Sequence, residues 1–237
     1  MAPPPDRTGL RNAAIFDLDR TITRRGTFTP FLLSVRAQGP ARFALFARFL
    51  PHMALYKTGR LSRTTLKNRM LAMALGGFER EEIAAHADRF VAQIMTDGLH
   101  ADALAAIARH RAAGDMLILA TASVDFYARL FAERLGFDHC IASPTDFDAA
   151  RDAPPQITGE NCYGLAKRAM VDAQLEALCG ADRAKLNIAF YTDHISDLPL
   201  LESADAPYVV NPKPALRAHA QKADWPICSW IAQGGKA

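Results

Sequence analysis

The sequence has few cysteines and no long apolar run. Its four cysteines, Cys140, Cys162, Cys179 and Cys228, form no C-x-x-C pair and have no histidine partner at zinc spacing, which argues against a disulfide scaffold or a zinc site. No run reaches the roughly 18 apolar residues of a membrane span, and the Pro-rich start lacks the basic and apolar regions of a signal peptide. We therefore expect a soluble, cytoplasmic protein with reduced cysteines.

Acidic residues are absent from one long stretch. The chain carries 28 Lys and Arg against 25 Asp and Glu, a net charge of only +3, yet no Asp or Glu lies between Arg20 and Phe78. The same stretch contains Arg and Lys throughout. This asymmetry predicts two units with different tasks, the basic one facing an anionic partner. A nucleic-acid partner is not expected, because no known binding motif is present.

The 237 residues, half of them hydrophobic, suffice for one sizeable core and a smaller second domain. Short apolar runs at 13–17, 115–121, 140–143, 186–192 and 207–210 predict buried strands, and helical periodicity lies between them. Residues 1–9 are expected to be a disordered tail. The predicted fold is α/β: a doubly wound parallel sheet formed by 10–25 and 98–237, with a helical cap, 26–97, inserted after the first strand. In such sheets ligands bind beyond the carboxyl ends of the strands.

Two pairs of carboxylates follow predicted strands. Asp17 and Asp19 end the first strand, and residues two apart on an extended backbone point the same way. Their repulsion must be relieved by a cation or a shared proton. Asp193 and Asp197 follow the strand at 186–192, and such hard oxygen ligands suit Mg²⁺. The simpler alternative is that an Asp in either pair only caps a turn or helix.

Other polar residues lie at the same predicted edge. Thr121 ends the strand at 115–121 and could help to hold phosphate oxygens, whereas Ser123 is expected to cap the next helix. Lys167 lies early in a helix, where most lysines are solvated. His194 is expected to be a partly buried loop residue, because Mg²⁺ disfavours imidazole.

Asp17-Leu-Asp19-Arg-Thr21, Thr121, Lys167 and Asp193-x-x-x-Asp197, in this order, resemble the motifs of the haloacid dehalogenase superfamily. The segments Asn161–Lys167 and Tyr191–Glu202, and Val209–Pro212 with Trp225–Ile227, are similar to its phosphoserine-phosphatase-like subgroup. The resemblance covers roughly the whole chain and implies the core and cap described above.

The resemblance also implies a mechanism of phosphomonoester hydrolysis. Asp17 would be the nucleophile that forms an aspartyl-phosphate, and Asp19 the general acid and base. Mg²⁺ would be held by Asp17, the Asp19 carbonyl oxygen, Asp193 and Asp197. Thr121 and Lys167 would bind the transferring phosphoryl oxygens. A carboxyl group at position 19 favours phosphate hydrolysis over dehalogenation, because an alkoxide leaving group must be protonated.

The cap is expected to select the substrate, a small phosphorylated metabolite. Phosphoserine phosphatases have a glutamate shortly after the first motif to receive the substrate amine, whereas this chain offers Arg24 and Arg25. These two arginines are therefore candidate selectivity residues, and phosphoserine is a doubtful substrate.

Three alternatives stay open. Aromatic and basic residues interleaved over 42–57 could rest on an anionic membrane surface, as a lipid phosphatase acting on phosphatidylglycerophosphate would require, although an ordinary amphipathic cap helix has the same pattern. The protein could instead be a regulatory or partner-binding module. A phosphotransferase that uses the same intermediate with an alcohol acceptor is the third.

Overall fold

The chain folds around a six-stranded parallel sheet. The computed structural model describes residues 11–35, 39–147, 153–180 and 185–230. The strands lie in the order β3 (His139–Ser143), β2 (Met116–Val124), β1 (Arg11–Phe16), β6 (Leu186–Thr192), β7 (Ala206–Val210) and β8 (Ile227–Cys228). Each strand pairs in parallel with its neighbour. The predicted doubly wound α/β fold is therefore confirmed. The predicted tail, 1–9, lies outside the described residues.

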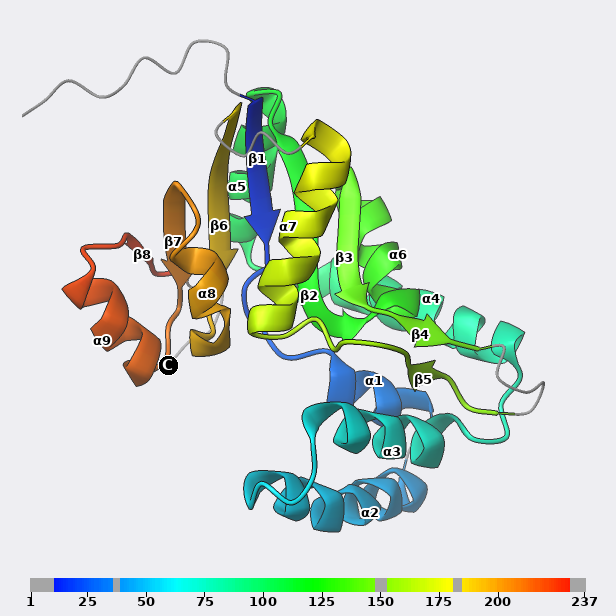
Figure 1. Cartoon of the computed structure of the whole chain (residues 1–237). Helices are drawn as coiled ribbons and strands as arrows, with labels where there is room; N and C mark the ends of the chain where they lie inside the picture. The colour runs from blue at the N-terminus through cyan, green and yellow to red at the C-terminus, as the bar shows by residue number, and fades with distance from the viewer. Residues whose placement is uncertain (1–10, 36–38, 148–152, 181–184, 231–237) are drawn as a thin grey trace, which may run out of the picture.

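Helices cover both faces of this sheet (Figure 1). Helices α5 (Ala101–Ala112) and α6 (Asp125–Leu135) lie on one face, and α7 (Leu165–Cys179), α8 (Leu198–Leu201) and α9 (Pro214–Lys222) on the other. Along β1, Ala14 and Phe16 join the hydrophobic cluster under α5 and α6, whereas Ala13 and Ile15 join the one under α7 to α9. Burial on both faces explains why the strand is an uninterrupted apolar run.

The chain reverses its winding between β1 and β6. From β1 it proceeds outward through β2 to β3, and from β6 outward through β7 to β8. Stacked rings link β1, β6 and β7. The ring centroids of Phe16 and Tyr191 lie 4.4 Å apart, and those of Tyr191 and Tyr208 lie 4.5 Å apart. A doubly wound sheet binds its ligands at this switch point.

Four helices form the insertion between β1 and β2: α1 (Phe28–Val35), α2 (Pro40–Lys57), α3 (Arg63–Leu75) and α4 (Arg80–Asp97). Helices α1, α2 and α3 lie beyond the carboxyl edge of the sheet, and α4 runs beside α6 (Figure 1). Phe31 of α1 packs against Phe90 of α4 and Tyr127 of α6. One hydrophobic cluster therefore continues from the cap into the α5 and α6 face.

The sequence pattern predicts no element between Ser143 and Tyr163, but a short antiparallel pair lies there. Strands β4 (Thr145–Asp146) and β5 (Gln156–Ile157) are two residues each, too short to show periodicity. The Ile157 amide donates to Asn68 Oδ1 of α3 at 2.8 Å, so this pair attaches the core to the cap. A 3₁₀ turn, η2 (Ile195–Asp197), precedes α8.

Within the described segments, none of the helices is both long and apolar enough to span a bilayer. The cytoplasmic location stays a prediction. None of the four cysteines, all of which lie within the described residues, forms a disulfide.

Candidate active site

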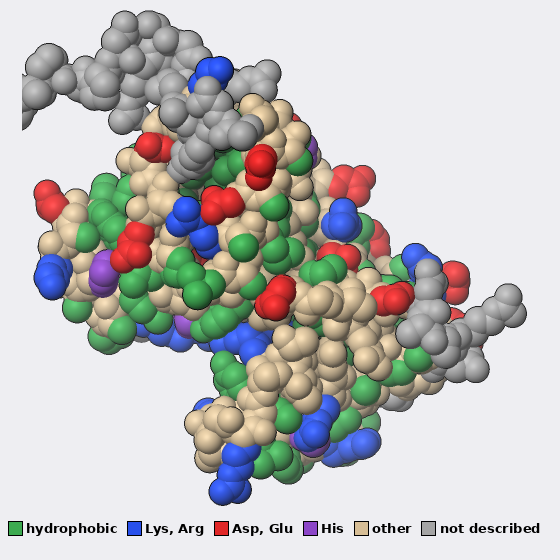
Figure 2. Space-filling view, viewed as in Figure 1, with side chains coloured by type: hydrophobic (Ala, Val, Ile, Leu, Met, Phe, Trp, Pro, Cys, Tyr) green, Lys and Arg blue, Asp and Glu red, His purple; other side chains and the backbone are tan. Residues whose placement is uncertain are grey.

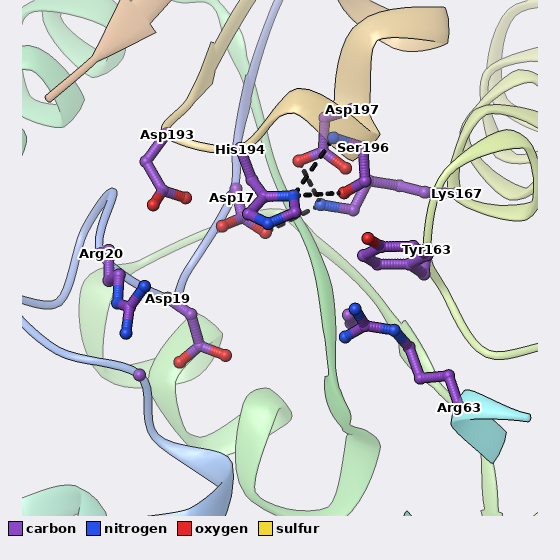
Figure 3. A pocket seen from close by; sticks show the side chains of 12 residues that line it. Asp17, Asp19, Arg20, Arg63, Tyr163, Lys167, Asp193, His194, Ser196 and Asp197 are labelled. Carbon is purple, nitrogen blue, oxygen red and sulfur yellow. Dashed lines mark hydrogen bonds and ion pairs between the residues drawn. The ribbon is translucent and has the colours of Figure 1, made fainter. Parts of the chain in front are cut away.

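Four carboxylates meet at the carboxyl ends of β1 and β6, where the winding reverses (Figure 3). Asp17 follows β1 directly, and its amide donates to the Tyr191 carbonyl oxygen of β6 at 2.9 Å. Asp193 follows β6, and Asp197 lies four residues later in η2. Asp17, Asp193 and Asp197 are buried, and Asp19 is half-buried. The two predicted acidic pairs therefore lie at one site.

These carboxylates line a cavity of about 150 Å³. A cavity of this size holds a benzene-sized molecule, so it has room for a phosphoryl group and little more. The core supplies most of its wall and the cap supplies Arg63 from the start of α3. The remaining lining residues are Arg20, Gly26, Ala122, Tyr163, Lys167, His194 and Ser196.

Lys167 lies between two of the carboxylates. It is 2% exposed, and its Nζ donates to Asp17 Oδ1 and to Asp197 Oδ2, both at 2.8 Å. Burial lowers the pKa of Lys167, but the attraction of Asp17 and Asp197 outweighs it, and the pKa lies above its ordinary value. Thr192 Oγ1 also donates to Asp197 Oδ2, at 2.7 Å. Sequence alone indicated a solvated lysine as the default, and the structure instead buries its charge.

One cation does not balance this cluster. Burial raises the pKa of Asp17 to about 8 although Lys167 opposes the shift, and the neighbouring Asp197, Asp193 and Asp19 raise it further. Burial also raises the pKa of Asp193 to about 6. Asp197 Oδ1 is buried and has no hydrogen-bond partner among the described residues. Burial therefore disfavours the charged forms of Asp17 and Asp193, and Asp197 keeps one oxygen without a donor, so a cation at this site would be stabilising.

Carboxylate oxygens gathered in this way fit a hard divalent cation. Among the described residues, no three His, Cys, Asp or Glu side chains are gathered closely enough to cage a metal ion. Mg²⁺ does not need such a cage, because it keeps several waters and takes one or two carboxylates together with phosphate oxygens. Asp17, Asp193 and the orphaned oxygen of Asp197 are suitable donors. His194 is occupied otherwise, since its Nδ1 accepts from the Ser196 amide at 3.1 Å.

Asp19 is held by hydroxyl and amide donors. Thr27, just before α1, donates to Asp19 Oδ1 from its amide at 2.6 Å and from its hydroxyl at 2.7 Å. Ser123 Oγ donates to Asp19 Oδ2 at 2.9 Å, and the fully buried Tyr127 donates its hydroxyl to Ser123 Oγ at 2.8 Å. Asp19 is thus oriented from β2, α6 and the entry to the cap together.

The prediction that Ser123 caps a helix is wrong. Strand β2 continues to Val124, which is the N-cap residue of α6, so the Ser123 side chain is free to reach Asp19. Thr121 is fully buried at the same strand end, and its Oγ1 accepts from the Ser123 amide at 3.1 Å. Its neighbour Ala122, rather than Thr121, lines the cavity.

The two arginines expected to select substrate lie away from the cavity wall. Arg24 and Arg25 are exposed, and Arg24 Nε donates to the Leu99 carbonyl oxygen at 2.9 Å. Arg20 and Arg63 are the arginines of the described lining. The Arg63 guanidinium lies 3.7 Å from the centre of the Tyr163 ring, and its buried Nε has no partner within the described part of the chain.

Lys67 is a second buried lysine, one turn after Arg63 in α3. Its Nζ donates to Asn161 Oδ1 at 2.8 Å and to the Ala122 carbonyl oxygen. Burial and the neighbouring Arg63 lower the pKa of Lys67 to about 8. A signal for this residue was present in the sequence: Lys67 lies on the same helical stripe as Met70, Leu71 and Ala74, which are buried. A lysine on an apolar stripe indicates a charge with a specific partner.

Known proteins resemble this chain over most of its length. A probable phosphatase of Mycobacterium tuberculosis is 28% identical over 96% of this chain and 80% of its own. A Bordetella pertussis protein of unknown function superposes with a TM-score of 0.83 at 27% identity, covering 94% of this chain and all of its own. A probable phosphoserine phosphatase from Vibrio cholerae, 15% identical, shares the fold with a TM-score of 0.67 over 96% of this chain and 65% of its own. The family model of the haloacid dehalogenase-like hydrolases matches residues 14–202. This match spans the motifs from Asp17 to Asp197, and the chain belongs to the haloacid dehalogenase-like hydrolase family.

Proposed function

We propose that the protein is a Mg²⁺-dependent phosphomonoester hydrolase that acts through an aspartyl-phosphate on Asp17. The observation that carries this proposal is the meeting of Asp17, Asp193, Asp197 and Lys167 at the switch point of the sheet. Membership of a hydrolase family and a relative named as a probable phosphatase support it.

Mg²⁺ would be held by Asp17, Asp193, the Asp19 carbonyl oxygen and Asp197. When bound, it would neutralise carboxylate charge and polarise the phosphoryl oxygens. Lys167 supplies the positive charge that this chain itself brings to the phosphoryl group, and it keeps Asp17 oriented through the 2.8 Å contact. Thr121 would orient the strand end whose next residue, Ala122, faces the phosphoryl group.

The first step forms a bond between an Asp17 carboxylate oxygen and phosphorus while the ester P–O bond breaks. Asp19, in its protonated form, gives its proton to the departing alkoxide oxygen. In the second step water attacks the phosphorus of the aspartyl-phosphate, and Asp19 takes the proton of that water. Inorganic phosphate leaves and the Asp17 carboxylate is restored. Thr27, Ser123 and Tyr127 hold Asp19 in position for both transfers.

The substrate proposed is a small phosphorylated metabolite whose leaving group carries hydrogen-bond acceptors or negative charge. The cap places Arg63 at the cavity, and it contributes no acidic side chain to the described lining. An ammonium group on the leaving side would therefore face Arg63 rather than a carboxylate. This arrangement disfavours phosphoserine and gives substrate selection to Arg63 and Arg20, with Arg24 and Arg25 outside the cavity.

The test is phosphate release from a panel of phosphoserine, sugar phosphates, carboxylate-bearing phosphomonoesters, histidinol phosphate and phosphatidylglycerophosphate, with Mg²⁺ or with EDTA. The Asp17→Asn protein should lose more than about a thousand-fold of the activity, since it lacks the nucleophile. The matched control is Asp172→Asn on the exposed side of α7, which should retain full activity.

Activity that survives Asp17→Asn or EDTA would contradict the proposal. A folded protein that binds Mg²⁺ yet releases phosphate from no member would favour a regulatory module. Transfer of phosphate to an added alcohol in preference to water would make the protein a phosphotransferase.

A further inference from the structure

Helix α2 of the cap has two apolar faces. Leu45 and Phe49 are buried and pack into the cap. Phe43, Phe46 and Leu50 are exposed by 76%, 39% and 49%. These three residues are spaced three and four apart, which places them on one side of the helix. We name Phe43, Phe46 and Leu50 the outer face of α2.

The outer face is larger than chance exposure explains. Isolated exposed apolar residues are normal on a protein surface. The other exposed large apolar side chains of the described residues, Leu104, Leu165 and Ile195, lie on three different elements. Among the helices and strands that the structure describes, only α2 has three such residues on one face, and two of them are aromatic.

Positive charge lies on and beside this face. At 100° per residue, the exposed Arg42 lies beside the outer face and Lys57 lies in line with it, whereas Arg48 lies on the opposite side of the helix. Lys57 and Arg60, at the end of the helix, are exposed as well. No acidic residue lies between Arg20 and Phe78, and in Figure 2 red side chains are seen over the core but not over the lobe formed by α2 and α3. An exposed apolar face with basic residues on and beside it can rest on an anionic membrane surface.

Charge decides between the possible occupants. A second copy of the chain, packed face to face, would bring two sets of arginines together without a nearby acid to neutralise them. A nucleic acid would pair with the arginines but would leave Leu50 and much of the phenylalanine surface without an apolar environment. An anionic bilayer satisfies both, because lipid phosphates meet the arginines and acyl chains receive the apolar side chains.

We propose that α2 docks the protein on anionic lipid bilayers, with Phe43, Phe46 and Leu50 inserted at the interface and Arg42 and Lys57 against lipid phosphates. This inference goes beyond the proposed function and does not depend on it. Helix α2 lies on the side of the cap remote from the sheet (Figure 1), so docking leaves the cavity residues untouched. It would deliver the site to phosphorylated molecules near a membrane.

The experiment is co-sedimentation of the full chain with phosphatidylcholine vesicles that contain or lack phosphatidylglycerol, at low and high salt. The protein should bind only the anionic vesicles, and salt should release it. Phe43→Glu and Leu50→Glu should each lower the partition coefficient by at least about ten-fold, and Arg42→Ala by about five-fold. Leu104→Glu on α5 is the matched control and should bind like the unaltered protein.

Thermal unfolding checks that each variant is folded, and the Asp17→Asn protein should bind vesicles normally, which separates docking from catalysis. The proposal is overturned if the unaltered protein ignores anionic vesicles, or if Phe43→Glu and Leu104→Glu bind equally well. A dimer in sedimentation velocity that Phe43→Glu dissociates would assign the outer face to a second copy instead.

Discussion

The carboxyl edge of the sheet and helix α2 carry charges of opposite sign in opposite environments. At the edge, Asp17, Asp197 and Lys167 are buried, and 2.8 Å contacts fix each position. On α2, Arg42 and Arg48 are exposed to solvent. Buried charges must be paired, so a substitution there affects catalysis and folding together. Exposed charges are free to meet an external partner, so a substitution there should change recognition alone.

The largest effect expected at the edge, after loss of the nucleophile, comes from Lys167. Lys167→Met removes the cation that bridges Asp17 and Asp197, and kcat/KM should fall by about 10²- to 10³-fold. The same change at the exposed Lys222 of α9 should leave kcat/KM unchanged. Equal activity in the two variants, measured by phosphate release, would show that the buried lysine has no catalytic task.

A smaller and more selective effect is expected from Ser123. Ser123→Ala removes one donor to Asp19, so proton transfer to a poor leaving group should slow by about ten-fold or more, part of the 10²- to 10⁴-fold that general acid–base catalysis supplies. Hydrolysis of p-nitrophenyl phosphate should slow by less than about three-fold, because its leaving group needs little protonation.

The comparison of an alkyl phosphate with p-nitrophenyl phosphate is the readout that a purely structural defect would not reproduce. Tyr127→Phe should show the same selectivity more weakly, because Tyr127 reaches Asp19 only indirectly, through the hydroxyl groups of Ser123 and Thr27. Equal slowing of both substrates would remove Ser123 from the acid–base step.

Substituting arginines at the cavity and outside it tests which of them binds the substrate. Arg63→Ala should raise KM by about ten-fold with little change in kcat, since Arg63 lines the cavity from the cap, where the proposed function places the leaving group. Arg24→Ala and Arg25→Ala should change KM by less than about two-fold, as expected for exposed positions outside the cavity. The reverse order would return selectivity to the residues that the sequence suggested.

The smallest expected effect is a dependence of stability on pH and Mg²⁺. In the folded protein the pKa of Asp17 is raised to about 8 and that of Asp193 to about 6, against about 4 in an unfolded chain. Between pH 4 and pH 8 the folded state thus binds more protons than the unfolded state, and the free energy of unfolding falls as pH rises.

Mg²⁺ competes with protons for the carboxylates, so it should raise Tm by several degrees at pH 8 and by less at pH 5. At a Mg²⁺ concentration of 100 times Kd, binding adds about 2.7 kcal/mol to the free energy of unfolding. Differential scanning fluorimetry measures both shifts. In Asp193→Asn the difference between the two pH values should shrink. A Mg²⁺ shift that is equal at both pH values would contradict the cation site.

Some residues of the site follow strand ends and others are placed by tertiary contacts, and this difference decides which of them the sequence predicts. Asp17 and Asp193 are predictable because each ends an apolar run that is buried on both faces, and the winding of a parallel sheet brings strand ends together. Ser123 is not predictable in this way, because its partner Asp19 lies 104 residues earlier and its role depends on β2 continuing to Val124, three residues beyond the predicted end of the strand. Arg63 reaches the cavity only through the way α3 docks on the core, which no local pattern encodes. The apolar stripe of α3 marks Lys67 as buried, but it does not identify Asn161 as the partner.

The most direct test of the central claim is to trap the intermediate. The protein is mixed with Mg²⁺ and the best substrate of the panel, quenched in acid, reduced with borohydride and digested for mass spectrometry. If Asp17 carries the phosphoryl group, reduction of the acyl phosphate converts residue 17 to homoserine, and protein treated without substrate keeps aspartate there. Turnover with homoserine at another position, or with none at all, would contradict the account.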